Sequence, residues 1–281
     1  MSYFKIKSHA KINLALHIIN KSSSLHKIES LIAFVSLHDD IFIKDIKSKN
    51  HKISFIGKFS NKISKKNTIS LLLKILEKKK LLGERKFHIK INKKIPIKAG
   101  FGGGSINAAS ILRYLIKKKI INTPQEEIIK ICKLIGSDVI LGLNPTNSIL
   151  TSNNRIKFFY NHKTFYTLIV KPSFGCSSKE IYSKVRKFDT PRFNKPSKKM
   201  FNFNFVKKMD NSLEKIALNK YPKLKKIKFD LENLSKPDFV RMTGSGSAFV
   251  AYFRSKQRCE FAKKNFIKIY KNYWCITSKT I

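Results

Sequence analysis

The stretch PIKAGFGGGSINAAS, residues 96–110, constrains the fold more than any other part of the chain. It holds four glycines, whereas the whole chain of 281 residues has 11. Before it, Phe87, Ile89 and Ile91 alternate with polar residues, which indicates a strand. After it, residues 105–118 carry apolar side chains at helical spacing, with Ser105 as the candidate N-cap. We therefore predict a strand, a glycine turn and the start of a helix in direct succession.

A glycine turn in this position favours an anion site. Two nucleotide motifs are excluded. The GxxxxGK[ST] loop is absent from the chain, and the GxGxxG fingerprint fails because Ser105 stands where its third glycine should be. Successive glycine N–H groups and the positive end of a helix can still hold phosphate oxygens, which a Cβ atom would keep at a distance. A turn that only reverses the chain is the alternative, but three consecutive glycines next to a fourth favour the phosphate site.

The rest of the first half predicts both strands and helices. Strands are expected at residues 4–19 and 40–46, and a helix at 67–80. A further helix is expected at residues 123–136. Its predicted signals are Thr123 as N-cap, Pro124 at the first helical position, Glu126 closing a capping box, and Gly136 at the end.

The character of the chain changes at about residue 151. A strand is expected at residues 164–172, followed by a polar stretch, 173–204, with little regular period. Helices follow at 211–233 and 255–270, a second glycine turn feeds a strand within 242–253, and a strand closes the chain at 273–278. We predict the α+β class with two domains, residues 1–150 and 151–281.

The formal net charge of +42 suggests nucleic acid as a partner. However, the chain has 51 Lys and only 8 Arg, and the lysines are spread over its whole length. Arg is the side chain preferred for bases and phosphates. We therefore interpret most of the charge as compositional drift on solvated faces and do not expect nucleic-acid binding.

The cysteines and the apolar segments bear on location. The four cysteines show no CxxC pair and no metal-ligand spacing, so free thiols in the cytoplasm are expected. No apolar run reaches the roughly 20 residues that a membrane span needs, and the N-terminus lacks a secretory cleavage site. We expect neither a membrane span nor a secretory signal.

Several motifs in order resemble the GHMP kinases, the family of galactokinase, homoserine kinase, mevalonate kinase and relatives. The glycine stretch resembles the family's P-x-x-A-G-L-G-G-G-S-S-N-A-A loop, and SHAKINLALHI and RMTGSGSAFVAYF stand in the matching places near the two ends. His26 and the GSDV segment, residues 136–139, are similar to the kinases of the non-mevalonate isoprenoid pathway. The resemblance covers nearly the whole chain and is weakest at residues 184–211.

The resemblance implies a two-domain GHMP kinase fold. Residues 1–150 would be a ribosomal S5 domain 2-like, ATP-binding domain, and residues 151–281 a ferredoxin-like, substrate-side domain. The implied reaction is phosphorylation by ATP, with Mg²⁺, of the 2-hydroxyl of a cytidine diphosphate-linked methylerythritol. Lys11 and Asp138 would be catalytic, with Asp138 taking the proton. The implied ATP-binding residues are Pro96, Ile97, Lys98, Ala99, Gly100, Phe101, Gly102, Gly103, Gly104, Ser105 and Ile106. The implied substrate-binding residues are Asn13, His26, Tyr182, Gly244 and Ser245, and no metal ligand can be assigned.

Other roles are open for these residues on spacing alone. Asp138 could be a turn or N-cap residue beside Ser137, Lys11 could be one more solvated lysine, and Tyr182 could only pack. Lys11 and Asn13 are two apart in an apolar strand, which predicts that they share a face.

The sequence also departs from the family pattern. Leu25 replaces the aromatic residue before His26, Phe101 replaces a leucine, and Ile106 replaces the second serine of the loop. Two alternative functions stay open. One is a GHMP kinase for another small alcohol, such as homoserine, mevalonate or a sugar. The other is an inactive, basic relative that binds nucleic acid. A monomer or a homodimer is expected.

Overall fold

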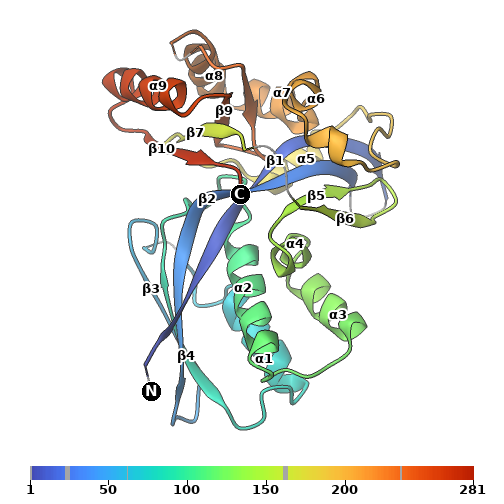
Figure 1. Cartoon of the computed structure of the whole chain (residues 1–281), viewed down its shortest axis with the longest axis vertical. Helices are drawn as coiled ribbons and strands as arrows, with labels where there is room; N and C mark the ends of the chain where they lie inside the picture. The colour runs from blue at the N-terminus through green and yellow to red at the C-terminus, as the bar shows by residue number, and fades with distance from the viewer. Residues whose placement is uncertain (1, 23–25, 62, 161–163, 235) are drawn as a thin grey trace. The chain divides into compact units, whose positions relative to one another are not determined.

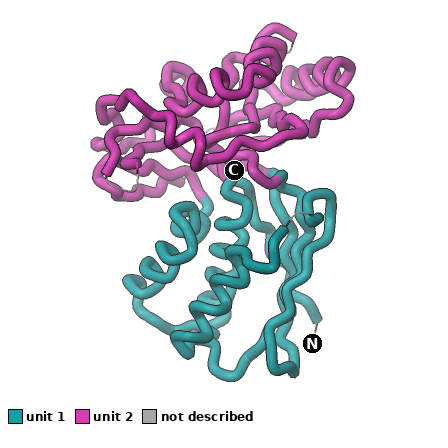
Figure 2. The backbone as a smooth tube through the Cα atoms, turned by 180° about the vertical axis from the view of Figure 1, so that it is seen from behind, with its two compact units in different colours: residues 1–10, 37–96, 102–145 teal, residues 11–36, 97–101, 146–281 magenta. Residues whose placement is uncertain are grey.

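The computed structural model describes residues 2–22, 26–61, 63–160, 164–234 and 236–281. The chain divides into two units, each built from separated segments (Figure 2). Unit 1 comprises residues 1–10, 37–96 and 102–145, and unit 2 comprises residues 11–36, 97–101 and 146–281. These two units are not contiguous in sequence, unlike the predicted domains 1–150 and 151–281. The reason is that β1 (Phe4–Lys21) and β2 (His26–Ile46) each have residues in both units. The division into an ATP-binding and a substrate-side domain stays a prediction.

Unit 1 packs helices on one face of a sheet (Figure 1). Within it β2 pairs antiparallel with β4 (Lys86–Asn92), and β4 pairs parallel with β3 (Lys52–Ile56). The inward residues of these strands are apolar, and they bury against α1 (Thr68–Lys78) and α2 (Gly103–Lys117). Helices α3 (Gln125–Ile135) and α4 (Val139–Leu143) complete the layer, α4 packing on α2. Burial of this apolar face holds α1 and α2 on the sheet.

Unit 2 contains a four-stranded antiparallel sheet in the order β10-β7-β9-β8. These strands are β7 (Tyr166–Lys171), β8 (Phe239–Met242), β9 (Phe249–Phe253) and β10 (Trp274–Lys279). Helices α8 (Lys223–Leu234) and α9 (Lys256–Ile269) contact this sheet, and α7 (Ser212–Lys220) contacts α8. The other elements of unit 2 are β5 (Asn147–Leu150), β6 (Ile156–Phe159), α5 (Ser178–Ser183), the 3₁₀ turn Lys198–Phe201 and α6 (Phe203–Lys208). β5 pairs with β2 and with β6.

Most predicted elements are confirmed, but two predicted helix starts are wrong. Helix α2 begins at Gly103, and its N-cap is Gly102 in the left-handed conformation (φ 64°), not Ser105. Glycine adopts this conformation without strain, so the helix can begin earlier. Helix α3 has Pro124, not Thr123, at the N-cap and no side-chain cap bond, so the predicted capping box is absent. Gly136 does end α3, as predicted.

Among the described residues, no helix is both long and apolar enough to cross a membrane.

A buried histidine links four segments of unit 2. His17 of β1 is 1% exposed, and its ring nitrogens lie 3.0 Å from Glu29 Oε1 and 2.8 Å from Asp210 Oδ1. Glu29, also buried, accepts hydrogen bonds from the backbone N–H groups of Arg192 (2.8 Å) and Phe193 (3.1 Å). Burial by itself would lower the pKa of His17, but the hydrogen bonds and charges of the two carboxylates outweigh it and raise the pKa to about 9. The histidine is therefore a cation at neutral pH. It ties β1 and β2 to the segment between α6 and α7, through Asp210, while Glu29 holds the loop before α6.

We expect this cation to make stability depend on pH. Because the folded pKa of His17 lies above its ordinary value of 6.5, its contribution is complete below pH 6.5 and is lost as the pH rises through about 9. The shift corresponds to about 3 kcal/mol of unfolding free energy. Urea unfolding of the wild type and of His17→Gln between pH 6 and 10 measures this contribution. The unfolding free energy of the wild type should fall by that amount as the pH rises, and that of the variant should not. A His88→Gln control should keep this decline, since the pKa of His88 is lowered by burial and by neighbouring lysines. Equal declines in wild type and His17→Gln would contradict the assignment.

Candidate active site

Three separate sequence motifs meet in unit 2. The backbone N–H of Lys11 donates to the carbonyl of Phe101 at 3.2 Å, which joins β1 to the glycine stretch. The N–H of Asn13 donates to Thr243 Oγ1 at 3.0 Å, which joins the same strand to the second glycine turn. The two turns also touch each other, because a Cβ atom on Gly100 would lie 2.0 Å from the carbonyl oxygen of Thr243. Segments more than 200 residues apart in the chain thus form one cluster.

Lys11 and Asn13 form a hydrogen-bonded pair inside this cluster. Both are nearly buried, at 6% and 5% exposure, and Lys11 Nζ donates to Asn13 Oδ1 at 2.8 Å. Asn13 Nδ2 in turn donates to Ser30 Oγ at 2.8 Å. The predicted shared face is confirmed, and the alternative of a solvated lysine is wrong. A lysine is rarely buried unless its charge is used or paired.

In unit 1 the glycines open helix α2. The first intrahelical hydrogen bond runs from the N–H of Ile106 to the carbonyl of Gly102 (2.9 Å), so the N–H groups of Gly103, Gly104 and Ser105 precede it. Such groups have no partner within a helix and are available to an anion. Ile106 itself is buried, which explains why an apolar residue can replace serine there. The backbone of this turn, not a side chain, presents the donors.

A buried carboxylate that sequence reasoning missed fixes this turn. Asp39 is fully buried and accepts hydrogen bonds from the backbone N–H groups of Lys94 and Ile95, both at 2.8 Å. It also accepts from the side chains of Asn107, at 2.9 Å, and of Lys93. Asp39 therefore ties the chain that enters the glycine stretch to the helix that leaves it. The sequence does not single this residue out, because β2 also carries Asp40 and Asp45.

Asp138 lies directly before α4 and is half-buried. It occupies the N-cap position of that short helix but makes no side-chain cap hydrogen bond, so a capping role does not account for it. Its segment lies beside the start of α2, since Ser105 Oγ is 3.4 Å from where a Cβ on Gly136 would be. Further along, a Cβ on Gly142 would lie 2.6 Å from the Cβ of Ala109, so α4 and α2 are in close contact.

The chain is similar in sequence to known kinases. Residues 67–146 match the family described as GHMP kinases N terminal domain. The chain is 56% identical over 281 residues, the full length of both proteins, to a 4-diphosphocytidyl-2-C-methyl-D-erythritol kinase of Pelagibacter ubique. The chain belongs to this kinase family. A second member, from Anaplasma marginale, is 31% identical over 266 residues, which are 90% of this chain and 89% of that protein.

Solved structures confirm the predicted α+β GHMP kinase fold. A crystal structure of 4-(cytidine 5'-diphospho)-2C-methyl-D-erythritol kinase superposes with a TM-score of 0.78 at 21% identity, covering 98% of this chain and 99% of that one. A homoserine kinase from Cytophaga hutchinsonii superposes with a TM-score of 0.70 at 15% identity, covering 100% and 95%. Since both share the fold, the fold alone does not select the substrate.

Two of the predicted substrate residues of this family member lie together in unit 2. The rings of His26, at the start of β2, and Tyr182, in α5, are 5.2 Å apart between centroids. Burial, followed by the charge of Lys21, lowers the pKa of His26, so its ring is neutral near pH 7 and can accept a hydrogen bond. Tyr182 also packs against the core of unit 2, as the alternative for this residue expected. The Leu25 departure lies outside the described residues.

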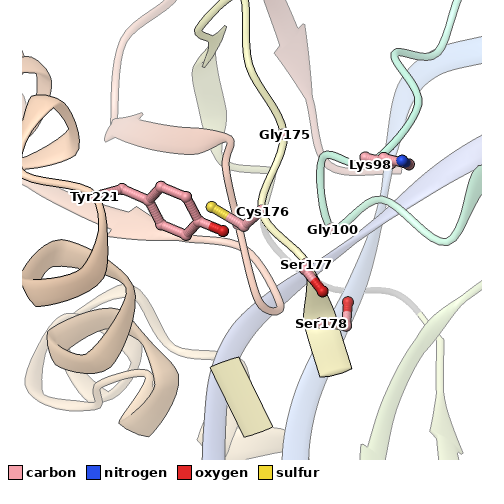
Figure 3. Close-up of a pocket in the computed structure, with 8 residues that line it drawn as sticks. Lys98, Gly100, Gly175, Cys176, Ser177, Ser178 and Tyr221 are labelled. Carbon is pink, nitrogen blue, oxygen red and sulfur yellow. The ribbon is translucent and has the colours of Figure 1, made fainter. Parts of the chain in front are cut away.

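A cavity of about 410 Å³ opens in unit 2 next to the glycine turns (Figure 3). The predicted substrate residue Ser245 lies at its edge, because its hydroxyl is 2.6 Å from that of Ser178. The lining residues are Lys98, Gly100, Gly175, Cys176, Ser177, Ser178, Tyr221 and Gly246.

No metal centre can be assigned within the described part of the chain. It holds no group of three or more His, Cys, Asp or Glu side chains placed to bind a metal ion. Mg²⁺ in nucleotide sites often uses only one or two carboxylates together with phosphate oxygens, so this finding leaves the predicted ion without named ligands.

Proposed function

We propose that this kinase transfers the γ-phosphoryl group of ATP to the 2-hydroxyl of 4-diphosphocytidyl-2-C-methyl-D-erythritol. The observation that carries the proposal is the 56% identity over the whole length of a relative with that name. The hydrogen-bonded meeting of the three motifs in unit 2 supports it, because those motifs are the ones that resemble the family.

The proposed roles follow from the demands of phosphoryl transfer. That reaction needs positioned reactants, stabilised phosphate charge and an acceptor for the hydroxyl proton. Asp138 is the proposed acceptor, since a carboxylate beside the attacking hydroxyl can take its proton. Lys11 would stabilise charge on the attacking oxygen, and Asn13, which holds the lysine ammonium at 2.8 Å, would orient it. The N–H groups at the start of α2 would hold ATP phosphates. Mg²⁺, expected with ATP, would neutralise phosphate charge.

The cytidine end of the substrate is assigned to His26 and Tyr182. A neutral imidazole can accept a hydrogen bond from the exocyclic amine of a cytosine, and a tyrosine ring can stack on a base. The free thiols at all four cysteines fit the proposed cytoplasmic location, and monomer or homodimer remains our proposal for the assembly.

ADP release by the purified protein with Mg-ATP tests the function. We expect release to rise at least about 100-fold above the ATP-only background when the cytidine diphosphate-linked substrate is added, because general acid–base groups alone contribute that much. Mevalonate, homoserine and galactose should not stimulate it. Activity only with one of those alcohols would discard the substrate and keep the fold. Silence with all of them, together with salt-sensitive and ATP-independent binding to duplex DNA, would favour the nucleic-acid alternative.

A further inference from the structure

Lys98 has an unusual backbone conformation for its place in the chain. Its φ of 51° lies in the left-handed region, which costs every residue except glycine backbone free energy. Two other lysines with positive φ, Lys80 and Lys119, each lie two residues after the end of a helix, where this conformation closes the helix. Lys98 is in the glycine stretch and closes no helix. A glycine there would avoid the strain, so the left-handed backbone of this exposed lysine points to a use of its side chain.

The neighbouring chain is shaped to accommodate this side chain. A Cβ atom on Gly175 would lie 2.8 Å from the Cβ of Lys98 and 3.0 Å from its carbonyl oxygen. Because real Cβ atoms do not approach so closely, only glycine at position 175 permits Lys98 to sit where it does. Lys98 and Gly175 are therefore a fitted pair in the wall of the cavity.

The cavity has the chemistry of an oxyanion site. Its described lining includes one cation, Lys98, and the hydroxyls of Ser177 and Ser178, but no carboxylate. Figure 3 shows Lys98 and Tyr221 on opposite sides, with the two serines between them in this view. Within the described residues no acid pairs with Lys98, while the nearest acid along the lining segment, Glu180, pairs with Lys220. The volume of the cavity, about 410 Å³, lies within the range of roughly 300–1,000 Å³ typical of small-ligand pockets.

Both ends of the proposed substrate adjoin this cavity within unit 2. Ser178 and Tyr182 are four residues apart in α5, so they lie on the same face of that helix, and Tyr182 contacts His26 at the proposed cytidine end. At the other end, Gly100 accepts a hydrogen bond from Thr243 Oγ1 at 3.4 Å, and the same Oγ1 accepts from the N–H of Asn13. The cavity thus lies between the residues assigned to the base and those assigned to the reacting alcohol.

We propose that Lys98, with Ser177 and Ser178, binds the diphosphate of the alcohol substrate. This inference rests on the proposed function, and it reassigns Lys98 from the ATP phosphates, for which its sequence motif had predicted it. The phosphates of ATP are left to the N–H groups of Gly103, Gly104 and Ser105, which belong to unit 1 and do not line this cavity. The glycine stretch then serves two anions, one with each of its halves.

Substitution of Lys98 separates the two anions. In Lys98→Met we expect the KM for the diphosphate substrate to rise at least about 10-fold, because a charge-assisted hydrogen bond is lost. The KM for ATP should stay within about twofold, and Lys98→Arg should keep most of the affinity for the substrate. Lys119→Met is the matched control, since Lys119 has the same left-handed φ (54°) and is exposed at the end of α2. A rise in the KM for ATP alone would assign Lys98 to the cofactor, and no rise in either would overturn the site.

Lys98→Gly distinguishes binding from a structural role. Glycine relieves the backbone strain, so this variant should melt at or above the temperature of the wild type while its KM for the substrate rises as in Lys98→Met. A lower melting temperature with an unchanged KM would show that the lysine only supports the fold.

Binding of inorganic pyrophosphate tests the anion site without turnover. Titration calorimetry of the full chain should detect binding to the wild type that weakens at least about 10-fold in Lys98→Met and stays unchanged in Lys119→Met. If pyrophosphate binding depends on Lys98 in this way while no alcohol stimulates ADP release, the proposed kinase function is contradicted and the oxyanion site is supported. Equal pyrophosphate binding by wild type and Lys98→Met would overturn the site itself.

Discussion

Asp138→Asn is expected to lower substrate-dependent ADP release by a factor of about 10²–10⁴, which is the usual contribution of a positioned general base. Asparagine keeps the size and the hydrogen-bonding capacity of the side chain but cannot take the proton of the attacking hydroxyl. The loss should appear in kcat, with the KM for both substrates changed by less than about threefold, because ground-state binding does not require the proton acceptor. Initial rates at saturating ATP and substrate measure it.

The fold should survive this substitution. Asp138 makes no cap hydrogen bond to α4, so no helix end loses a partner. The melting temperature of Asp138→Asn should stay within about 2 °C of the wild type, because asparagine keeps the size and the hydrogen-bonding capacity of this half-buried side chain. Ser137→Ala, at the exposed neighbouring residue, is the control and should retain full activity. Retention of more than a tenth of the rate by Asp138→Asn would remove the aspartate from its proposed role.

Sequence patterns were most informative where a physical constraint is local. The alternation of Phe87, Ile89 and Ile91 predicted β4, and the bare backbone after it predicted the turn into α2. Alternation also placed Lys11 and Asn13 on one face, although the chain has 51 lysines. These patterns depend only on the period of a strand or a helix, which the order of residues displays directly.

The rest depends on contacts between distant residues. Asp39 accepts hydrogen bonds from residues 55, 56 and 68 positions further along the chain, and no local pattern announces such partners. β5 and β6 have four residues each, too few to show a period. The predicted cap at Ser105 is wrong because the left-handed backbone of Gly102 starts the helix at Gly103, two positions earlier, and this conformation outweighs the ordinary preference for serine at an N-cap. The resemblance implied Lys98 only as one of the ATP-binding residues, because its φ and its fit against Gly175 belong to the folded chain and not to the sequence pattern.

Gly100→Ala is expected to be the most damaging single-methyl change in unit 2. Gly100 has a φ of 83°, so alanine there is strained by about 1–2 kcal/mol before any contact is considered. The new Cβ would also lie 2.0 Å from the carbonyl oxygen of Thr243, which is buried backbone and not a flexible side chain. Overpacking of a tight site typically adds about 1–3 kcal/mol. We expect the unfolding free energy to fall by about 2–5 kcal/mol in total.

Gly83→Ala separates the two causes. Gly83 has a φ of 55° and nothing within 4 Å of the added methyl group, so it carries the backbone strain alone. Gly100→Ala should therefore melt roughly 2–12 °C below Gly83→Ala, since the extra overpacking cost shifts the melting temperature of a chain this long by about 2–4 °C per kcal/mol.

Activity should separate the two variants further. The clash moves the turn whose Thr243 hydroxyl accepts from the N–H of Asn13, and Asn13 holds the ammonium of Lys11. Equal melting temperatures and equal rates for the two variants would mean that the two glycine turns do not touch in solution. A Gly100→Ala protein that melts like Gly83→Ala but turns over at least about 10-fold more slowly would mean that the turns yield without unfolding, so that their contact serves to position Lys11.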